Sequence, residues 1–206
     1  MKIFIVGATG RVGSRIVNYA LKGGHEVVAL VRQPDKLAAV DGKLTLFQGD
    51  ARNEADIRLA MQGADVAVSA LGTDGTTTLS ESISIMIDEM SRQGIQRIVT
   101  VGTAGILQSR TNPELLRYQS AESKRRSTFA AEEHQRVYEL LKNSDLDWTI
   151  VCPTFLPDGE PVGEYRVERD YLPEGGTSIS VGDTAEFTYR QINSGAYSCT
   201  RVGIAY

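Results

Sequence analysis

The sequence predicts an α/β protein built on a doubly wound parallel sheet, and three observations lead to this expectation. Apolar, strand-like runs alternate with amphipathic, helix-like runs over about three quarters of the 206 residues, which is typical of successive strand–helix–strand units. A glycine-spaced turn directly joins the first such strand to the first helix. The strand-like runs are short and almost wholly apolar, as expected for strands buried on both faces.

The elements follow one another regularly as far as Pro153. The expected strands are runs rich in Val and Ile: Ile3–Val6, Val27–Val31, Leu44–Phe47, Asp65–Ala70, Arg97–Val101 and Trp148–Val151. The expected helices repeat apolar residues every three or four positions: Arg11–Leu21, Ala55–Met61, Leu79–Arg92 and Ala130–Lys142. Gly23 and Gly24 follow the first helix and are expected to end it.

Two stretches depart from this alternation. Residues 107–128 are polar and lack a clear period, and a loop this long in a compact domain is usually functional, so we treat it as a candidate lid or substrate wall. Beyond Pro153 the chain is richer in Gly, Pro and charge, with a strand expected near Tyr165–Val167, a helix capped by Asp183 and a last strand at Cys199–Ile204. We expect one domain, residues 1–206, in which 154–206 form a small C-terminal cap on the substrate side.

Composition excludes several classes of protein. The formal net charge of −4 argues against a nucleic-acid-binding face, which requires excess basic charge. The two cysteines, Cys152 and Cys199, are far apart and lack metal-ligand spacing, so we expect no metal site, and a buried thiol at Cys152. No apolar run approaches the roughly 20 residues of a membrane span, and the chain enters its first strand at once. We expect a cytoplasmic monomer or weak dimer.

The glycine-spaced turn carries the strongest functional signal. Gly7, Gly10 and Gly13 fit the G-x-x-G-x-x-G form of the dinucleotide-binding fingerprint, in which the glycines allow a tight turn, close approach of a pyrophosphate and close helix packing. The intervening residues Thr9, Arg11 and Val12 would border the same phosphates, beside the free N–H groups of the helix N-terminus. A plain tight turn is the alternative, but the strand–turn–helix context favours a Rossmann-like NAD(P) site.

Arg32 indicates which nicotinamide cofactor would bind. An NAD-specific fold usually presents an acid to the ribose hydroxyls about 20 residues beyond the turn, and here Arg32 lies 19 residues beyond Gly13. Arginine suits the 2′-phosphate of NADP through charge-assisted hydrogen bonds. Arg11 could lie over the same phosphate or over the adenine. Both could instead be solvated surface cations, but the missing acid favours NADPH.

Residues that follow other strands complete the expected cofactor site, because the carboxyl ends of parallel strands share one edge of the sheet. Asp50 and Ala51 follow the third strand, where the Asp50 carboxylate could accept from the adenine amino group or serve only as a turn or N-cap residue. Leu71 and Gly72 follow the fourth strand and would let the cofactor pass close to the backbone. Pro153 ends the sixth.

The candidates for chemistry are few. Tyr138 and Lys142 have the Tyr-x-x-x-Lys spacing of short-chain dehydrogenases, but they lie near the end of a helix, only 15 residues before Pro153, so an exposed i,i+4 pair is expected. Thr103, just past the fifth strand, could face the nicotinamide or a substrate carbonyl, or bond its own backbone. His134 could act as an acid–base group or lie buried on its helix against the sheet.

These residues add up to a family resemblance over nearly the whole chain. The segments Gly7–Gly13, Val31–Arg32, Gly49–Asp50 and Asp145–Pro153 resemble the atypical short-chain dehydrogenases of the NmrA-like group. The runs Glu132–Arg136 and Asp158–Val167 are similar, more narrowly, to the NADPH-dependent flavin reductases, also called biliverdin-IXβ reductases.

The resemblance implies hydride transfer from NADPH to a flavin or a related tetrapyrrole in a shallow, open pocket. Thr103 falls where this family carries a serine that lines the acceptor pocket. Phe155 stands where the family carries a pocket histidine, and a phenyl ring can stack on an isoalloxazine but cannot give a proton. The expectation is therefore an NADPH-dependent reductase of free FMN or riboflavin. The alternatives are a quinone or carbonyl reductase of the same fold, and a non-enzymatic NADP-binding redox sensor.

Overall fold

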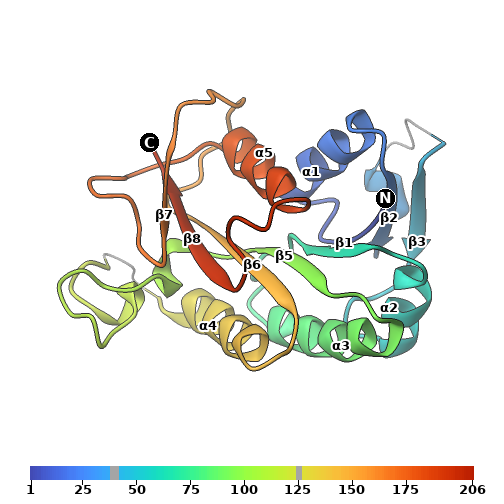
Figure 1. Cartoon of the computed structure of the whole chain (residues 1–206), viewed down its shortest axis with the longest axis horizontal. Coiled ribbons are helices and arrows are strands. Elements are labelled where there is room, and N and C mark those ends of the chain that lie inside the picture. Colours follow the sequence, from blue (N-terminus) through green and yellow to red (C-terminus); the bar gives the residue numbers. More distant parts are fainter. Residues whose placement is uncertain (38–41, 124–126) are drawn as a thin grey trace.

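The computed structural model describes residues 1–37, 42–123 and 127–206. Its strands form one eight-stranded sheet in the order β3-β2-β1-β4-β5-β6-β8-β7, shown in Figure 1. In chain order the strands are β1 (Lys2–Val6), β2 (Glu26–Val31), β3 (Leu44–Gln48), β4 (Val66–Ser69), β5 (Arg97–Val101), β6 (Asp147–Pro153), β7 (Arg166–Arg169) and β8 (Thr200–Ala205). All neighbouring strands are parallel except β7, which runs antiparallel to β8 at the edge. The predicted Rossmann-like fold is confirmed.

Helices cover both faces of the sheet, as the doubly wound prediction requires. Figure 1 shows α1 (Arg11–Lys22) and α5 (Val181–Gln191) on one face, and α2 (Glu54–Met61), α3 (Thr78–Gln93) and α4 (Phe129–Lys142) on the other. Each layer has its own core. On the first face Ile5, Ile16 and Val202 are fully buried, and on the second Phe4, Ile83 and Ile98 are. The alternation of side chains along each strand supplies both layers.

The strand order reverses between β1 and β4, because the chain winds outward from β1 to β3 and then returns to the other side of β1. In open α/β sheets, ligands bind outside the carboxyl ends of the strands at such a reversal. The turns after β1, β2, β3 and β4 therefore meet at one crevice.

The C-terminal part is joined closely to the sheet. Strand β8 is buried along its whole length and pairs in parallel with β6, while α5 packs against α1. The last strand begins at Thr200, one residue later than expected, after Cys199 at φ 50°. The strand expected at Tyr165–Val167 is β7, shifted to Arg166–Arg169.

The predicted cap of α5 was wrong. Ser180 is the N-cap residue, and its hydroxyl accepts from the Asp183 N–H at 2.9 Å. The Asp183 carboxylate instead accepts hydrogen bonds from the N–H groups of Val162 and Gly163 and from the Tyr206 hydroxyl. It thereby anchors the segment 154–163, which follows β6, to the start of α5.

The stretch 107–128 contains local structure. A short helix, η3 (Arg117–Gln119), lies within it, and Gln108 and Leu116 form an isolated antiparallel bridge. Lys124, Arg125 and Arg126, which belong to the predicted loop, lie outside the described residues. Within the described ranges, no helix has both the length and the apolar character needed to cross a membrane.

The predicted burial of the Cys152 thiol is confirmed. Cys152 is completely buried in β6, and burial raises the pKa of its thiol to about 12. A thiol that remains protonated at neutral pH is a weak nucleophile, so Cys152 is a core residue. Cys199 is exposed, and both cysteines are free.

Candidate active site

The glycine turn has the geometry that a dinucleotide-binding loop requires. Gly7 has φ 78°, and a Cβ there would lie 2.4 Å from the carbonyl carbon of Ala70. A Cβ on Gly13 would lie 2.1 Å from the Gly7 carbonyl oxygen. Gly7 therefore permits close contact between the turn after β1 and the end of β4, and Gly13 lets α1 pack on the turn. Larger residues at either position would displace backbone.

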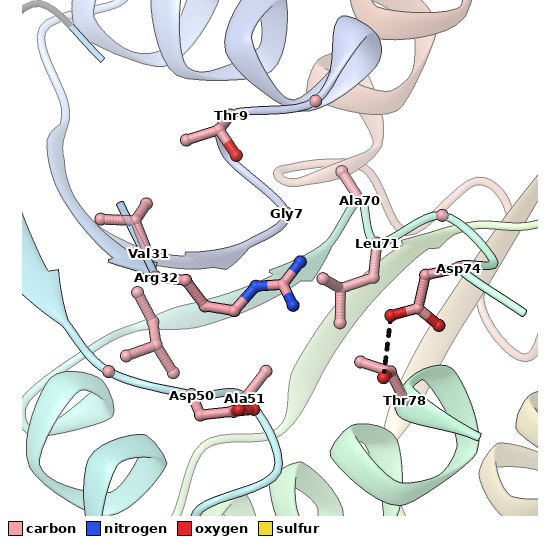
Figure 2. Close-up of a pocket in the computed structure, with 14 residues that line it drawn as sticks. Gly7, Thr9, Val31, Arg32, Asp50, Ala51, Ala70, Leu71, Asp74 and Thr78 are labelled. Atoms are coloured by element: carbon pink, nitrogen blue, oxygen red, sulfur yellow. Dashed lines mark hydrogen bonds between the residues drawn. The ribbon is translucent and has the colours of Figure 1, made fainter. Parts of the chain in front are cut away.

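A polar cavity of about 190 Å³ lies beside this turn, at the carboxyl ends of β1 to β4. Figure 2 shows the Arg32 side chain extending into it between the glycine turn and Ala51. The lining brings together most of the predicted cofactor residues, from four separate loops: Gly7, Thr9, Gly10, Arg32, Asp50, Ala51, Leu71 and Gly72. Val12 is buried in α1 behind the turn, and neither it nor Gly13 or Pro153 lines this cavity.

Arg32 also borders a second, basic hollow. A depression of about 300 Å³ is lined by Thr9, Arg32, Gln33 and Lys36. Lys36 ends the short helix η1 (Pro34–Lys36). Two cations and a hydroxyl that converge on one hollow could bind a phosphate monoester through charge-assisted hydrogen bonds.

Asp50 lines the cavity and also forms a local turn. Its carboxylate accepts from the Arg52 N–H at 2.9 Å and from the Arg52 guanidinium at 3.0 Å, so it forms a local turn while lining the cavity. The Arg52 guanidinium lowers the pKa of the Asp50 carboxyl. The group therefore stays an ionised acceptor. The N-cap of α2 is Asn53, not Asp50.

A third cavity, of about 700 Å³, lies beside the start of α1, past the carboxyl ends of β5 and β6. Its walls come from η2 (Ala104–Ile106), from the 107–128 stretch and from the segment 154–163, with Arg11 and Thr177 beside them. Phe155 contributes an aromatic ring that is 70% exposed, and Tyr118 lies in the same lining. We call this hollow the outer cavity.

Arg11 belongs to the outer cavity rather than to the cavity that holds Arg32. Its guanidinium donates to the Asp158 carboxylate at 2.9 Å and to the Leu156 carbonyl at 3.2 Å. The sequence expectation that Arg11 lies over the 2′-phosphate or the adenine differs from this geometry. The reason is that α1 begins at Arg11 and directs that side chain toward the segment after β6.

Neither Thr103 nor His134 lines the outer cavity. The Thr103 hydroxyl accepts from the Gly105 N–H at 3.4 Å and begins η2, which is the local role weighed for it. His134 is buried on α4 among Ala131 and Val137. Phe155 is thus the predicted substrate residue that the structure brings into the cavity.

Tyr138 and Lys142 lie far along α4, where the Tyr138 ring meets Trp148 edge-on at 5.8 Å, near the start of β6. The start of β6 is at the amino edge of the sheet, opposite the cavities. The Lys142 ammonium and the Arg201 guanidinium lie over the Tyr138 ring. The pair is therefore a packing feature, although Tyr138 is half-buried rather than exposed.

Sequence reasoning missed several lining residues. Asp74 and Thr78 line the Arg32 cavity, and the Thr78 hydroxyl donates to the Asp74 carboxylate at 3.2 Å. Figure 2 shows the two residues side by side. They follow β4, so inspection of every residue after a strand, beyond Gly72, would have included Asp74. Arg117 also lines the outer cavity, and only the position of its loop had been singled out.

Comparison with known proteins agrees with this geometry. The model of a family described as NAD(P)H-binding matches residues 7–195. The uncharacterized protein YwnB of Bacillus subtilis is 28% identical over 200 residues, covering 90% of this chain and 89% of its own. The curated plant reductases that match, such as an isoflavone reductase homologue from Zea mays, share only part of their length: 81 residues, 26% of that protein.

Solved structures extend the likeness to the whole chain. A Burkholderia pseudomallei protein that carries the name of an exported protein is 30% identical, with a TM-score of 0.86 and complete coverage of both chains. A Streptococcus pneumoniae protein that carries the name of an NADH-flavin reductase is 26% identical, with a TM-score of 0.80, and covers 100% of this chain and 99% of its own.

The glycine turn, the polar cavity at the strand-order reversal and the family match agree with one another. They also confirm the resemblance to the atypical short-chain dehydrogenases of the NmrA-like group. The chain belongs to the NAD(P)H-binding family and has the Rossmann fold of NAD(P)H-dependent oxidoreductases.

Proposed function

We propose that the protein is an NADPH-dependent reductase that transfers a hydride to a free flavin, FMN or riboflavin, as a diffusible substrate. The observation that carries the proposal is the pair of cavities on either side of the glycine turn. One is small, polar and lined by the predicted cofactor residues. The other is larger, with aromatic side chains on its wall. A dinucleotide that crossed the turn would bring its nicotinamide to the outer cavity.

The residues present fit a dinucleotide. A Cβ added to Gly72 would have no atom within 4 Å. The backbone there is therefore open to a ligand bound in the cavity. The turn from Gly7 to Gly13 would hold the pyrophosphate with the N–H groups at the start of α1. Asp50 would accept from the adenine amino group.

NADPH rather than NADH is favoured by the basic hollow. Arg32 and Lys36 border the position next to the turn where the adenosine ribose would lie, and two cations there suit a 2′-phosphate. An acid at that place would instead suit the free ribose hydroxyls of NADH.

The chemistry asks little of the protein beyond positioning. NADPH, when bound, supplies a hydride, which carries two electrons to the flavin; with one proton from solvent this yields the reduced flavin and NADP⁺. The outer cavity would orient the planar acceptor, with Phe155 stacked on its ring, and would hold the reacting atoms at short range. Thr103 and His134 do not line this cavity, and we assign neither of them the transfer of the proton.

Three observations support the flavin acceptor. An exposed phenyl ring on an open cavity suits a flat aromatic substrate that binds and leaves, and a related structure carries the name of an NADH-flavin reductase. Tyr138 and Lys142, which a carbonyl reductase of this superfamily would use, lie at the opposite edge of the sheet.

The test is to follow NADPH oxidation with FMN and riboflavin, and with a quinone and an aldehyde in parallel. Flavin turnover well above that with the quinone and the aldehyde is expected. Faster turnover of the quinone or aldehyde would identify a different reductase. Tight NADPH binding without turnover of any acceptor would identify a redox sensor.

A further inference from the structure

The outer cavity carries a feature that reduction of a neutral ring does not need. Two arginines line it from different elements: Arg11 from the start of α1, and Arg117 from η3. Glu122 is the carboxylate among its described lining residues. The remaining wall is made of small, hydroxyl-bearing or apolar side chains.

Each guanidinium has a partner that an anionic ligand could replace or share. Arg11 pairs with Asp158, whose side chain is 79% exposed. Exposed ion pairs contribute little stability, about 0–1 kcal/mol, so an incoming anion could take the place of Asp158 at low cost. The Arg117 Nε lies 3.5 Å from Glu122, which is longer than a close charge-assisted hydrogen bond.

Glu122 is better fixed than Asp158. Its Oε2 accepts from the Arg110 N–H at 2.9 Å and from the Ser120 hydroxyl at 3.4 Å. These contacts hold the carboxylate on its own loop rather than in the middle of the cavity. Arg11 is therefore the cation whose partner exchanges most readily.

We propose that Arg11, with Arg117 in the same cavity lining, forms a subsite for an anionic group on the acceptor, and that this group is the phosphate of FMN. The phosphate would displace Asp158 from Arg11 while the flavin ring lies against Phe155. This inference rests on the proposed flavin reductase function and narrows it to a phosphorylated flavin. It also separates the roles of two arginines: Arg32 would serve the cofactor and Arg11 the acceptor.

Arg15 provides a matched control on the same helix. It lies one turn beyond Arg11 and pairs with Glu160 of the same 154–163 segment through two hydrogen bonds of 2.7 and 2.9 Å. It does not line the outer cavity. Arg15→Gln therefore removes the same charge and a comparable ion pair with the segment 154–163. It does not remove a cation from the proposed subsite.

The experiment measures KM for FMN and for riboflavin at saturating NADPH, in the unmodified protein and in Arg11→Gln, Asp158→Asn and Arg15→Gln. The ratio of the FMN KM to the riboflavin KM is the readout. Arg11→Gln should raise this ratio about tenfold, the effect of losing one charge-assisted hydrogen bond to a partly exposed phosphate. Asp158→Asn should lower it, since it removes the competing carboxylate, and Arg15→Gln should leave it unchanged.

A second readout does not depend on turnover: quenching of flavin fluorescence on titration with the protein, without NADPH. FMN should bind more tightly than riboflavin, and the difference should shrink in Arg11→Gln and at high salt. An unchanged KM ratio in Arg11→Gln, with both flavins still reduced, would overturn the subsite but not the flavin reductase function. If Arg11→Gln raised the KM for NADPH and raised the KM for the two flavins equally, the subsite would also be overturned. Arg11 would then be assigned to the cofactor. Failure to reduce or bind either flavin would overturn both proposals.

Discussion

Replacement of Arg32 by aspartate tests how the protein distinguishes NADPH from NADH. In the structure the Arg32 guanidinium reaches into the cavity beside the glycine turn and borders the hollow that it shares with Thr9 and Lys36. We expect Arg32→Asp to remove the main cation that would contact a 2′-phosphate. The new carboxylate would repel that phosphate and could accept from the ribose hydroxyls of NADH.

The magnitude follows from the contacts that would be lost. A hydrogen bond to a charged group contributes about 1.5–3 kcal/mol, and Arg32 is exposed, so solvent weakens it toward the lower end of this range. Lys36 would remain in place. A loss of about 2 kcal/mol corresponds to a fall of roughly thirtyfold in kcat/KM for NADPH.

The assay compares kcat/KM for NADPH and NADH with the same flavin, in the unmodified protein, in Arg32→Asp and in Arg58→Asp. Arg58 is an exposed residue of α2 outside the cavities, so its variant makes the same change in charge away from the site. The NADPH:NADH ratio should collapse in Arg32→Asp alone. An unchanged ratio in that variant would refute the assignment of Arg32 to the 2′-phosphate. An equal fall of the ratio in both variants would show that the effect comes from the net charge of the protein.

Three further predictions concern the turn, the anchored segment and the excluded dyad. Gly7→Ala should lower the free energy of unfolding by about 3 kcal/mol, because the positive φ of Gly7 and the Ala70 backbone both oppose a Cβ. Urea unfolding measures this free energy. A loss below about 1 kcal/mol would contradict the geometry of the turn. Burial alone would raise the pKa of Asp183, but hydrogen bonds, that from Tyr206 foremost, outweigh it and lower the pKa. The carboxylate therefore stabilises the fold above its ordinary pKa near 4, and Asp183→Asn should cost about 2 kcal/mol at neutral pH. That difference should shrink as acid protonates the unmodified protein below about pH 4, and a pH-independent difference would exclude the charge as its source. Tyr138→Phe should leave flavin turnover unchanged. A fall in turnover of about a hundredfold, the effect of losing a general acid, would instead indicate that Tyr138 and Lys142 act in catalysis as in short-chain dehydrogenases.

The sequence predicted those parts of the fold that local pattern determines. The strands from β1 to β6 lie within one or two residues of their expected bounds, because apolar runs buried on both faces have few alternatives. The glycine turn was equally predictable, since Gly7 and Gly13 meet backbone where a Cβ does not fit. Arg32 and Asp50 came together as expected because the loops after parallel strands share one edge of the sheet.

The remaining differences arise from contacts between segments far apart in the chain. Arg11 turns toward Asp158, 147 residues later, and no local pattern reports that partner. Asp183 looks like a helix cap in the sequence, but Ser180 takes the cap and the carboxylate is left to bind the segment 154–163. The walls of the outer cavity come from several such segments, so Arg117 and Tyr118 could be placed there only once the structure was known.

The most direct test of the proposed function is the rate of NADPH oxidation with FMN as acceptor, with NADH measured in parallel at the same concentration. We predict turnover that saturates with FMN and is much faster with NADPH than with NADH. Protein that binds NADPH yet oxidises it no faster in the presence of FMN than in its absence would contradict the assignment of the outer cavity to a flavin acceptor.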